Sequence, residues 1–123
     1  MEHVHSILLI KKDDKFLTYY DNRWEINMFP NIKGNKIEDI KKKMKYDFNV
    51  DNCNVKFLFD KVHEKYSYPN KEMRTYHHYF YEVEIDADIN DGLYTSLEHL
   101  LLDDKVVLRN SDIIHYVKEY YNK

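Results

Sequence analysis

The chain has 123 residues and a formal net charge of −3, with one cysteine, two glycines and twelve tyrosines. This length is typical of one domain, here residues 1–123, and the charge excludes a bulk attraction to nucleic acid, so no nucleic-acid polymer is expected as a partner. The lone cysteine excludes an internal disulfide and favours a reducing compartment. No signal peptide and no apolar run of membrane-spanning length is evident, which predicts a cytoplasmic chain.

The first half of the chain begins with two predicted strands. Residues 3–10 end in a continuous apolar run, which indicates a strand buried on both faces. Residues 16–20 form a second strand, and the polar residues 11–15 between them predict a hairpin. A short extended stretch, 24–30, and a loop, 31–35, follow.

One amphipathic helix is predicted over Ile37–Phe48. Its apolar residues recur at spacings of three and four and share one face: Ile37, Ile40, Met44 and Phe48. The lysines at 41, 42, 43 and 45 lie on the other face. Asn49 follows, and asparagine tolerates the left-handed conformation that often ends a helix.

Residues 55–62 alternate between apolar and polar side chains and predict a strand. The polar segment 63–74 contains a Pro-Asn pair, which indicates a long exposed hairpin loop. Residues 75–85 form the strongest predicted strand. Its odd-numbered side chains, from His77 to Ile85, form the better core face, and its even-numbered side chains form the other face.

The C-terminal part is predicted to hold a short strand and two helices. Residues 93–95 form the strand, and Ser96 caps a short helix over 97–103. Residues 106–108 are predicted to be extended or loop. A final helix over 112–121, capped by Asn110 or Ser111, buries Ile113, Ile114, Val117 and Tyr120. Strands followed by an inserted helix, more strands and terminal helices indicate an α+β chain or an α/β/α sandwich.

The order of these elements resembles the Nudix superfamily. Trp24-Glu25, then Phe29-Pro30, then one amphipathic helix that ends in Asn49 and Val50 follow the outline of the family's sequence box. The resemblance implies a Nudix-like α/β/α sandwich with a mixed sheet. It also implies an ancestral Mg²⁺-dependent hydrolysis of nucleoside diphosphates linked to other groups.

The residues that carry this chemistry in the family are replaced here. The family's arginine and the glutamate after it fall on Lys42 and Lys43, and its paired glutamates fall on Tyr46 and Asp47. Because Mg²⁺ needs clustered oxygen ligands, a lysine at such a position disfavours the ion. We therefore expect no catalytic residue, no metal ligand and no cofactor. An alternative stays open, in which Glu38, Asp47 and Glu64 rebuild the site of a divergent Mg²⁺-dependent pyrophosphohydrolase.

Within the superfamily, the chain resembles the SMODS-associated Nudix domains of bacterial anti-phage (CBASS) systems. Those domains are regarded as inactive sensors of a nucleotide second messenger and are often fused to transmembrane helices. The resemblance implies a catalytically inactive effector domain for a nucleotide-derived ligand, such as a cyclic oligonucleotide, in a homo-oligomer or in the cytoplasmic part of a membrane effector. A second alternative is a protein-interaction module that uses the tyrosine-rich surface.

The predicted ligand site combines cations with aromatic side chains, which bind phosphates and stack on bases. Its candidate residues are Arg23, Trp24, Lys43, Tyr66, Arg74, Tyr76, His78 and Phe80. Each also has a structural interpretation: the lysines as a solvated helix face, Trp24 as a core residue, and the even-numbered face of the strand as a surface packed under a helix. His77 and His78 point to opposite faces of a strand, so they cannot bind one metal ion together.

Overall fold

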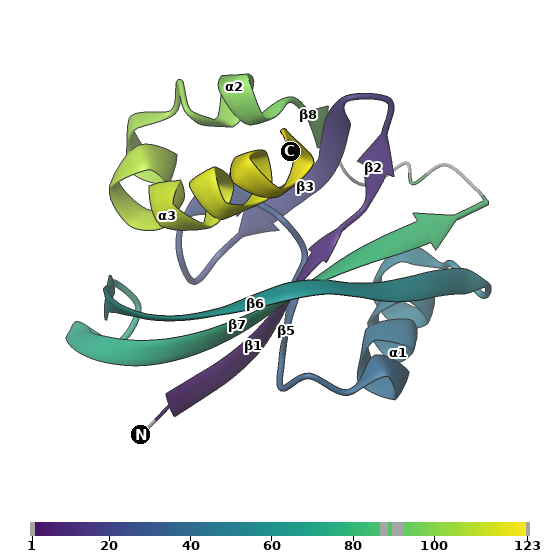
Figure 1. The fold of residues 1–123 in the computed structure, drawn as a ribbon, viewed down its shortest axis with the longest axis horizontal. Coiled ribbons are helices and arrows are strands. Elements are labelled where there is room, and N and C mark those ends of the chain that lie inside the picture. Colours follow the sequence, from purple (N-terminus) through teal and green to yellow (C-terminus); the bar gives the residue numbers. More distant parts are fainter. Residues whose placement is uncertain (1, 87–88, 90–92, 123) are drawn as a thin grey trace.

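The computed structural model describes all residues except 1, 87–88, 90–92 and 123 (Figure 1). The described elements are β1 (Glu2–Leu9), β2 (Lys11–Lys12), β3 (Lys15–Asp21), β4 (Ile26–Met28), β5 (Asn31–Lys33), α1 (Ile37–Phe48), β6 (Cys53–Ser67), β7 (Glu72–Ile85), β8 (Leu93–Thr95), α2 (Leu97–Leu100) and α3 (Asp104–Tyr121). This is an α+β fold, as the sequence predicts.

The central sheet has the strand order β5-β1-β7-β6. β1 and β7 are parallel, while the β1–β5 and β6–β7 pairs are antiparallel, so the sheet is mixed as expected. Figure 1 shows α1 and α3 on opposite sides of this sheet. A second sheet joins β2, β3 and β4, with β8 also paired to β3.

The N-terminal hairpin is present but is made by β2 and β3, with a turn at residues 13–14. β1 itself pairs with β5 and β7. The predicted loop 31–35 is wrong for its first part, because Asn31–Lys33 forms β5 along the edge of β1. Gly34 ends that strand with φ +85°, a left-handed conformation that suits glycine.

The predicted helix matches α1 at both ends. Asn49 closes it in the left-handed conformation with φ 58°, and the N–H of Val50 donates to the carbonyl of Met44. Ile40 and Met44 are fully buried, whereas Ile37 remains 47% exposed. The apolar stripe of α1 therefore packs from Ile40 to Phe48, and only its first residue lies largely outside the core.

The long exposed loop predicted over residues 63–74 is wrong. β6 continues to Ser67 and β7 begins at Glu72, so the two strands form one long hairpin. The Pro69-Asn70 pair occupies only the four-residue turn, where the Asn70 side chain donates to Ser67 Oγ at 2.8 Å. Polar residues thus lie in strand conformation up to the turn, and their alternation along the strand decides on which face of the sheet each of them lies.

The predicted core face of β7 is only half correct. Tyr81 and Val83 are buried on the odd face, but Tyr76, His78 and Phe80 are buried on the even face. The reason is that each helix covers a different part of the strand. Phe80 packs with residues of α3, whereas Tyr81 and Val83 pack with Ile40 and Met44 of α1.

Ser96 caps α2 as predicted, because its hydroxyl accepts from the N–H of His99, although α2 ends at Leu100. The extended segment predicted at 106–108 is wrong, since α3 begins at Asp104 and Asp103 caps it. Asn110 interrupts α3 with φ −141°, near the predicted start of the last helix. Ile113, Ile114 and Val117 are buried and Tyr120 is partly buried. None of the helices in the described part of the chain has the length and apolar character needed to cross a membrane.

Candidate functional site

A cleft opens on the α3 side of the central sheet, beside the turn between β3 and β4. Its empty volume is about 700 Å³, counting the open space at its mouth. The cavity within the cleft measures about 70 Å³, below the roughly 300–1,000 Å³ of typical small-molecule sites. The lining residues come from β1, the segment from the end of β3 to the start of β5, β6, β7 and α3: His5, Ile7, Asp21, Arg23, Trp24, Met28, Phe29, Asn31, Lys65, Arg74, Tyr76, His78, Asn110 and Ile113.

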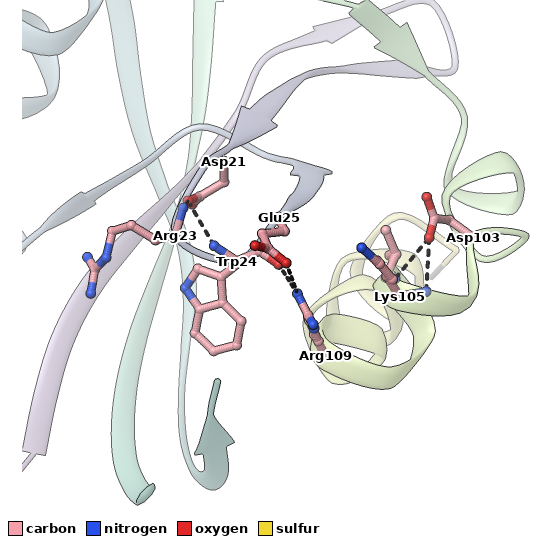
Figure 2. A network of polar contacts seen from close by, with 8 residues as sticks. Asp21, Arg23, Trp24, Glu25, Asp103, Lys105 and Arg109 are labelled. Atoms are coloured by element: carbon pink, nitrogen blue, oxygen red, sulfur yellow. Dashed lines mark hydrogen bonds and ion pairs between the residues drawn. The ribbon is translucent and has the colours of Figure 1, made fainter. Parts of the chain in front are cut away.

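The turn between β3 and β4 carries one wall of the cleft. The carboxylate of Asp21 accepts from the backbone N–H groups of Arg23 (2.9 Å) and Trp24 (3.3 Å). Figure 2 shows Arg109 reaching from α3 to the Trp24–Glu25 segment, while the side chain of Arg23 points away from Arg109. The turn thus presents Trp24 and Arg23 in different directions.

Arg109 fixes this turn from outside the cleft. Its guanidinium donates to the backbone carbonyl of Trp24, lies 4.0 Å from a carboxylate oxygen of Glu25, and sits 4.7 Å from the centre of the Tyr68 ring. Its Nε is buried without a hydrogen-bond partner. Since Arg109 does not line the cleft, it acts as a positioning residue for Trp24.

Lys65 supplies a buried cation at the floor of the cleft. Its ammonium donates to Asn110 Oδ1 at 2.7 Å and to Asp112 Oδ1 at 3.1 Å, and it lies 5.4 Å from the centre of the Trp24 ring. Burial lowers the pKa of Lys65, and the charge and hydrogen bond of Asp112 oppose that shift. The kink of α3 at Asn110 therefore brings an amide and a carboxylate to one lysine.

Two histidines continue this polar network. His63 Nδ1 lies 2.8 Å from a carboxylate oxygen of Asp112, and His63 Nε2 lies 2.7 Å from His78 Nδ1. Burial, followed by the charges of His63, Lys65 and His5, lowers the pKa of His78 to about 3. Burial would raise the pKa of Asp112, but the hydrogen bond from His63 and the charge of Lys65 outweigh it and hold that pKa well below its ordinary value.

The field inside the cleft is positive. Burial lowers the pKa of His5, and the charges of Arg23, His3, Lys33 and Arg74 lower it further. The acid Asp21 also lines the cleft, but its carboxylate is held by the backbone of the turn. A cleft with this field and aromatic walls suits an anion that carries a flat ring system.

The structure brings five of the eight predicted ligand residues into this one cleft, namely Arg23, Trp24, Arg74, Tyr76 and His78. Arg74 is held by Glu72, whose carboxylate accepts from Arg74 Nε at 2.6 Å. The rings of Tyr76 and His78 stack in parallel with centroids 5.3 Å apart. Their role in binding stays a prediction, but their placement is that of one site.

The other three predicted residues lie elsewhere. Lys43 donates to Asp47 at 2.6 Å on α1, on the opposite side of the sheet. Phe80 is fully buried, with its ring 4.3 Å from that of Phe59. Tyr66 is 41% exposed beside Tyr68 at the end of the hairpin and is not a lining residue.

Sequence reasoning missed His5, His63, Lys65 and Asp112, which complete the cleft and its network. His63 and Lys65 lie two residues apart on β6 and therefore share a face. That signal was available in the sequence, but the interpretation of 63–74 as a loop removed it. Asp112 was predicted only as the first residue of a helix, and no local pattern connects it with Lys65, 47 positions away.

The residues of α1 that align with the Mg²⁺-binding positions of the Nudix family do not fit the ion. Among the described residues, no three His, Cys, Asp or Glu side chains cluster so as to hold a metal. Lys43, at a position where the family has an acid, neutralises Asp47, the one retained carboxylate. Mg²⁺ takes near-octahedral oxygen ligands, and a single paired carboxylate does not supply them.

No protein-family model matches the chain, and no curated protein matches it either. Solved structures do match. The Ap4A hydrolase of C. elegans superposes with a TM-score of 0.59 at 11% identity, over 99% of this chain and 97% of that one. A Nudix-family hydrolase from Clostridium perfringens gives 0.63 at 11% identity, over 98% and 96%. The chain has the Nudix fold.

A third structure of the same kind extends this result. The MutT protein of methicillin-resistant Staphylococcus aureus 252, a Nudix hydrolase, superposes with a TM-score of 0.54 at 12% identity, over 100% of this chain and 98% of that one. These similarities span almost the full length of both proteins in each pair. At such identities they establish the Nudix fold and leave activity to be argued from the site.

Proposed function

We propose that this Nudix-fold chain binds a nucleotide-derived ligand in the cleft and does not hydrolyse it with Mg²⁺. The observation that carries the proposal is the positive cleft itself. Arg23 and Arg74 can pair with phosphate, and the rings of Trp24 and Tyr76 can stack on a base. The misfit of Mg²⁺ to the residues of α1 supports binding without the hydrolysis implied by the family.

In more detail, we propose that the chain acts as a sensor. A cyclic oligonucleotide second messenger would occupy the cleft, and the bound state would favour one association state of the chain, as in a population shift. The proposed role is that of a cytoplasmic effector domain in bacterial anti-phage defence. The resemblance to SMODS-associated Nudix domains supports this form, and sedimentation of the chain with and without the bound nucleotide tests the change of assembly.

A ligand panel tests the binding proposal. Thermal unfolding is followed in EDTA with cyclic dinucleotides, cyclic trinucleotides and linear nucleoside diphosphate conjugates. We expect one ligand class to raise the unfolding temperature, because a ligand that binds only the folded chain stabilises it. No shift with any member of the panel contradicts the proposal.

A pair of variants locates the binding. Trp24→Ala removes about 1–3 kcal/mol of stacking, which weakens affinity by roughly fivefold to 150-fold. Lys42→Ala removes an exposed cation of α1 on the far side of the sheet and leaves affinity unchanged. Equal effects of the two substitutions would place the ligand outside the cleft.

A second candidate function is a divergent pyrophosphohydrolase, and the hydrolase names of the similar structures favour testing it. Phosphate release from nucleoside diphosphate conjugates in Mg²⁺ or Mn²⁺, abolished by Asp47→Asn, would establish it. A cleft filled by its own side chains would favour the interaction module instead. The cavity within the cleft measures only about 70 Å³, so a ligand-bound structure is the test that separates the interaction module from the binding proposal.

A further inference from the structure

Asp112, His63 and His78 form a hydrogen-bonded chain that ends in the cleft. The carboxylate of Asp112 is 2.8 Å from His63 Nδ1, and His63 Nε2 is 2.7 Å from His78 Nδ1. The remaining ring nitrogen, His78 Nε2, has no hydrogen-bond partner among the described residues. It is also not one of the unpaired side-chain atoms that are sealed from solvent in this part of the chain. Because the His78 ring lines the cleft, Nε2 is the nitrogen open to it.

When both histidines are neutral, these hydrogen bonds determine which ring nitrogen of each carries its hydrogen. Asp112 accepts the hydrogen on His63 Nδ1, so a neutral His63 has a lone pair on Nε2 and accepts the hydrogen on His78 Nδ1. A neutral His78 then presents a lone pair at Nε2. In this state the cleft offers an acceptor, which repels an anion.

One added proton turns His78 Nε2 from an acceptor into a donor. The proton binds His78 Nε2, and the hydrogen on His78 Nδ1 moves to His63 Nε2. His63 becomes the imidazolium, held beside the Asp112 carboxylate, while His78 stays neutral and now donates from Nε2 into the cleft. The charge therefore resides next to a carboxylate and not on the more deeply buried ring, where burial lowers the pKa to about 3.

We propose that His78 Nε2 is the subsite for an oxyanion of the ligand, and that the anion binds together with one proton held by the chain His78–His63–Asp112. This deepens the proposed function, on which it rests for the identity of the natural ligand. A phosphodiester or phosphate oxygen has the required chemistry, since it is an acceptor that a neutral N–H can bind.

The charged groups around His78 favour the same occupant. They are His5 from β1, His63 and Lys65 from β6, Asp112 from α3, and, along the cleft walls, Asp21, Arg23 and Arg74. The positive charges among them oppose protonation of the hydrogen-bonded chain His78–His63–Asp112 when no anion is bound. An anion in the cleft offsets that repulsion, so anion binding and proton uptake reinforce each other by the same factor.

Sulfate is the probe of choice, because its charge is constant across the pH range in which histidine titrates. Long-range ¹H–¹⁵N correlation spectra of the histidine rings report the tautomer and charge of His63 and His78 during pH titrations with and without sulfate. We expect sulfate to shift the proton uptake to higher pH and to place the charge on His63. We also expect its affinity to fall by up to about tenfold per pH unit above that titration, the limit for one linked proton. Sulfate affinity independent of pH, or unchanged spectra of both rings, overturns the proposal.

A matched pair of variants separates this chain from ordinary histidine–acid contacts. Asp112→Asn removes the carboxylate that holds the charged His63, so the sulfate-induced shift is lost. Asp60→Asn removes a carboxylate that lies 2.6 Å from His77 Nε2, the neighbouring histidine on the other face of β7, and leaves the shift unchanged. If Asp112→Asn fails to fold, His63→Gln provides the same comparison. A shift that survives both Asp112→Asn and His63→Gln overturns the role of the chain.

The result is independent of the nucleotide panel. If a nucleotide binds but sulfate causes no proton uptake, the proposed function stands and the proton-linked subsite is refuted. Proton-linked sulfate binding without any nucleotide binding supports the subsite and refutes the proposed ligand class.

Discussion

The two faces of the central sheet are covered by helices of different character. On one face α1 buries Ile40 and Met44 completely, and the side chains of its Lys43–Asp47 pair are 17% and 53% exposed. On the other face α3 buries Ile114 but also holds Asp112 against two side chains of β6. His63 and Lys65 are each only 11% exposed at the side chain, and a cluster of titratable groups at a cleft is a candidate functional site. α1 thus packs against one face of the sheet, and the cleft to which we assign ligand binding lies on the α3 face.

The largest expected effect concerns the core of the α3 face. Phe80→Ala should destabilise the fold by about 3–5 kcal/mol, because it empties a fully buried position and removes a ring stacked on Phe59. Urea unfolding followed by circular dichroism measures the loss. Phe57→Ala is the matched control toward the α1 face. Phe57 is 48% exposed, with its ring near Tyr79 and Tyr81, and we expect a loss of about 1 kcal/mol or less.

These two variants also test the predicted role of Phe80. If Phe80 served as a base platform, Phe80→Ala would weaken nucleotide binding while leaving the free energy of unfolding nearly unchanged. A large loss of stability identifies it as a core residue, as its burial indicates.

A smaller effect is expected from acid. The pKa of His78 is lowered from 6.5 to about 3 in the folded chain, so between these values the unfolded chain binds a proton that the folded chain excludes. Stability is therefore fully present above pH 6.5 and falls as the pH drops, by at most about 1.4 kcal/mol per unit. We expect a loss of about 1–3 kcal/mol between about pH 6.5 and pH 4.5, measured by urea unfolding. The lowered pKa of Asp112 adds a further loss only below about pH 4.

The adjacent histidine again separates the two faces. His78→Gln should flatten the pH dependence, because the buried titrating group is gone. His77→Gln is the matched variant on the other face of β7, where the histidine lies between Glu2 and Asp60. A slope that responds to His77 and not to His78 would show that the α1 face, and not the cleft, controls acid stability.

The same comparison explains what the sequence could predict. α1 and its closing Asn49 were predicted correctly because the packing of this helix is local: the apolar spacing and Asn49 lie within thirteen residues. Five of the lining residues were among the predicted ligand residues, and they come from two local patterns: the Arg23-Trp24 pair and the alternation of Arg74, Tyr76 and His78. Its floor was not, because β6 and α3 meet there through contacts between residues far apart in the chain.

Two errors have a common physical cause. Residues 63–74 were predicted to be a loop from their polar residues and Pro-Asn pair, and residues 106–108 were predicted to be extended or loop, both from local sequence alone. Pairing with β7 and capping by Asp103 decided both segments instead. Lys43, predicted to bind the ligand, lies away from the cleft for a related reason. The family pattern gives its position along α1, but not the residue with which it pairs.

The smallest expected effect is that of Lys43→Ala. Lys43 and Asp47 are spaced i,i+4 on α1 at 2.6 Å, and Asp47 is 53% exposed, so the pair contributes only about 0.3–0.5 kcal/mol to stability. Because Lys43 lies across the sheet from the cleft, the affinity for any nucleotide found in the panel should stay within about twofold, as measured by calorimetry. Lys65→Met is the informative partner, since this lysine is also paired with an aspartate but lines the cleft, and its loss should weaken binding severalfold or more. If Lys43→Ala weakens binding as much as Lys65→Met, the ligand contacts α1, and the division of roles between the two faces is wrong.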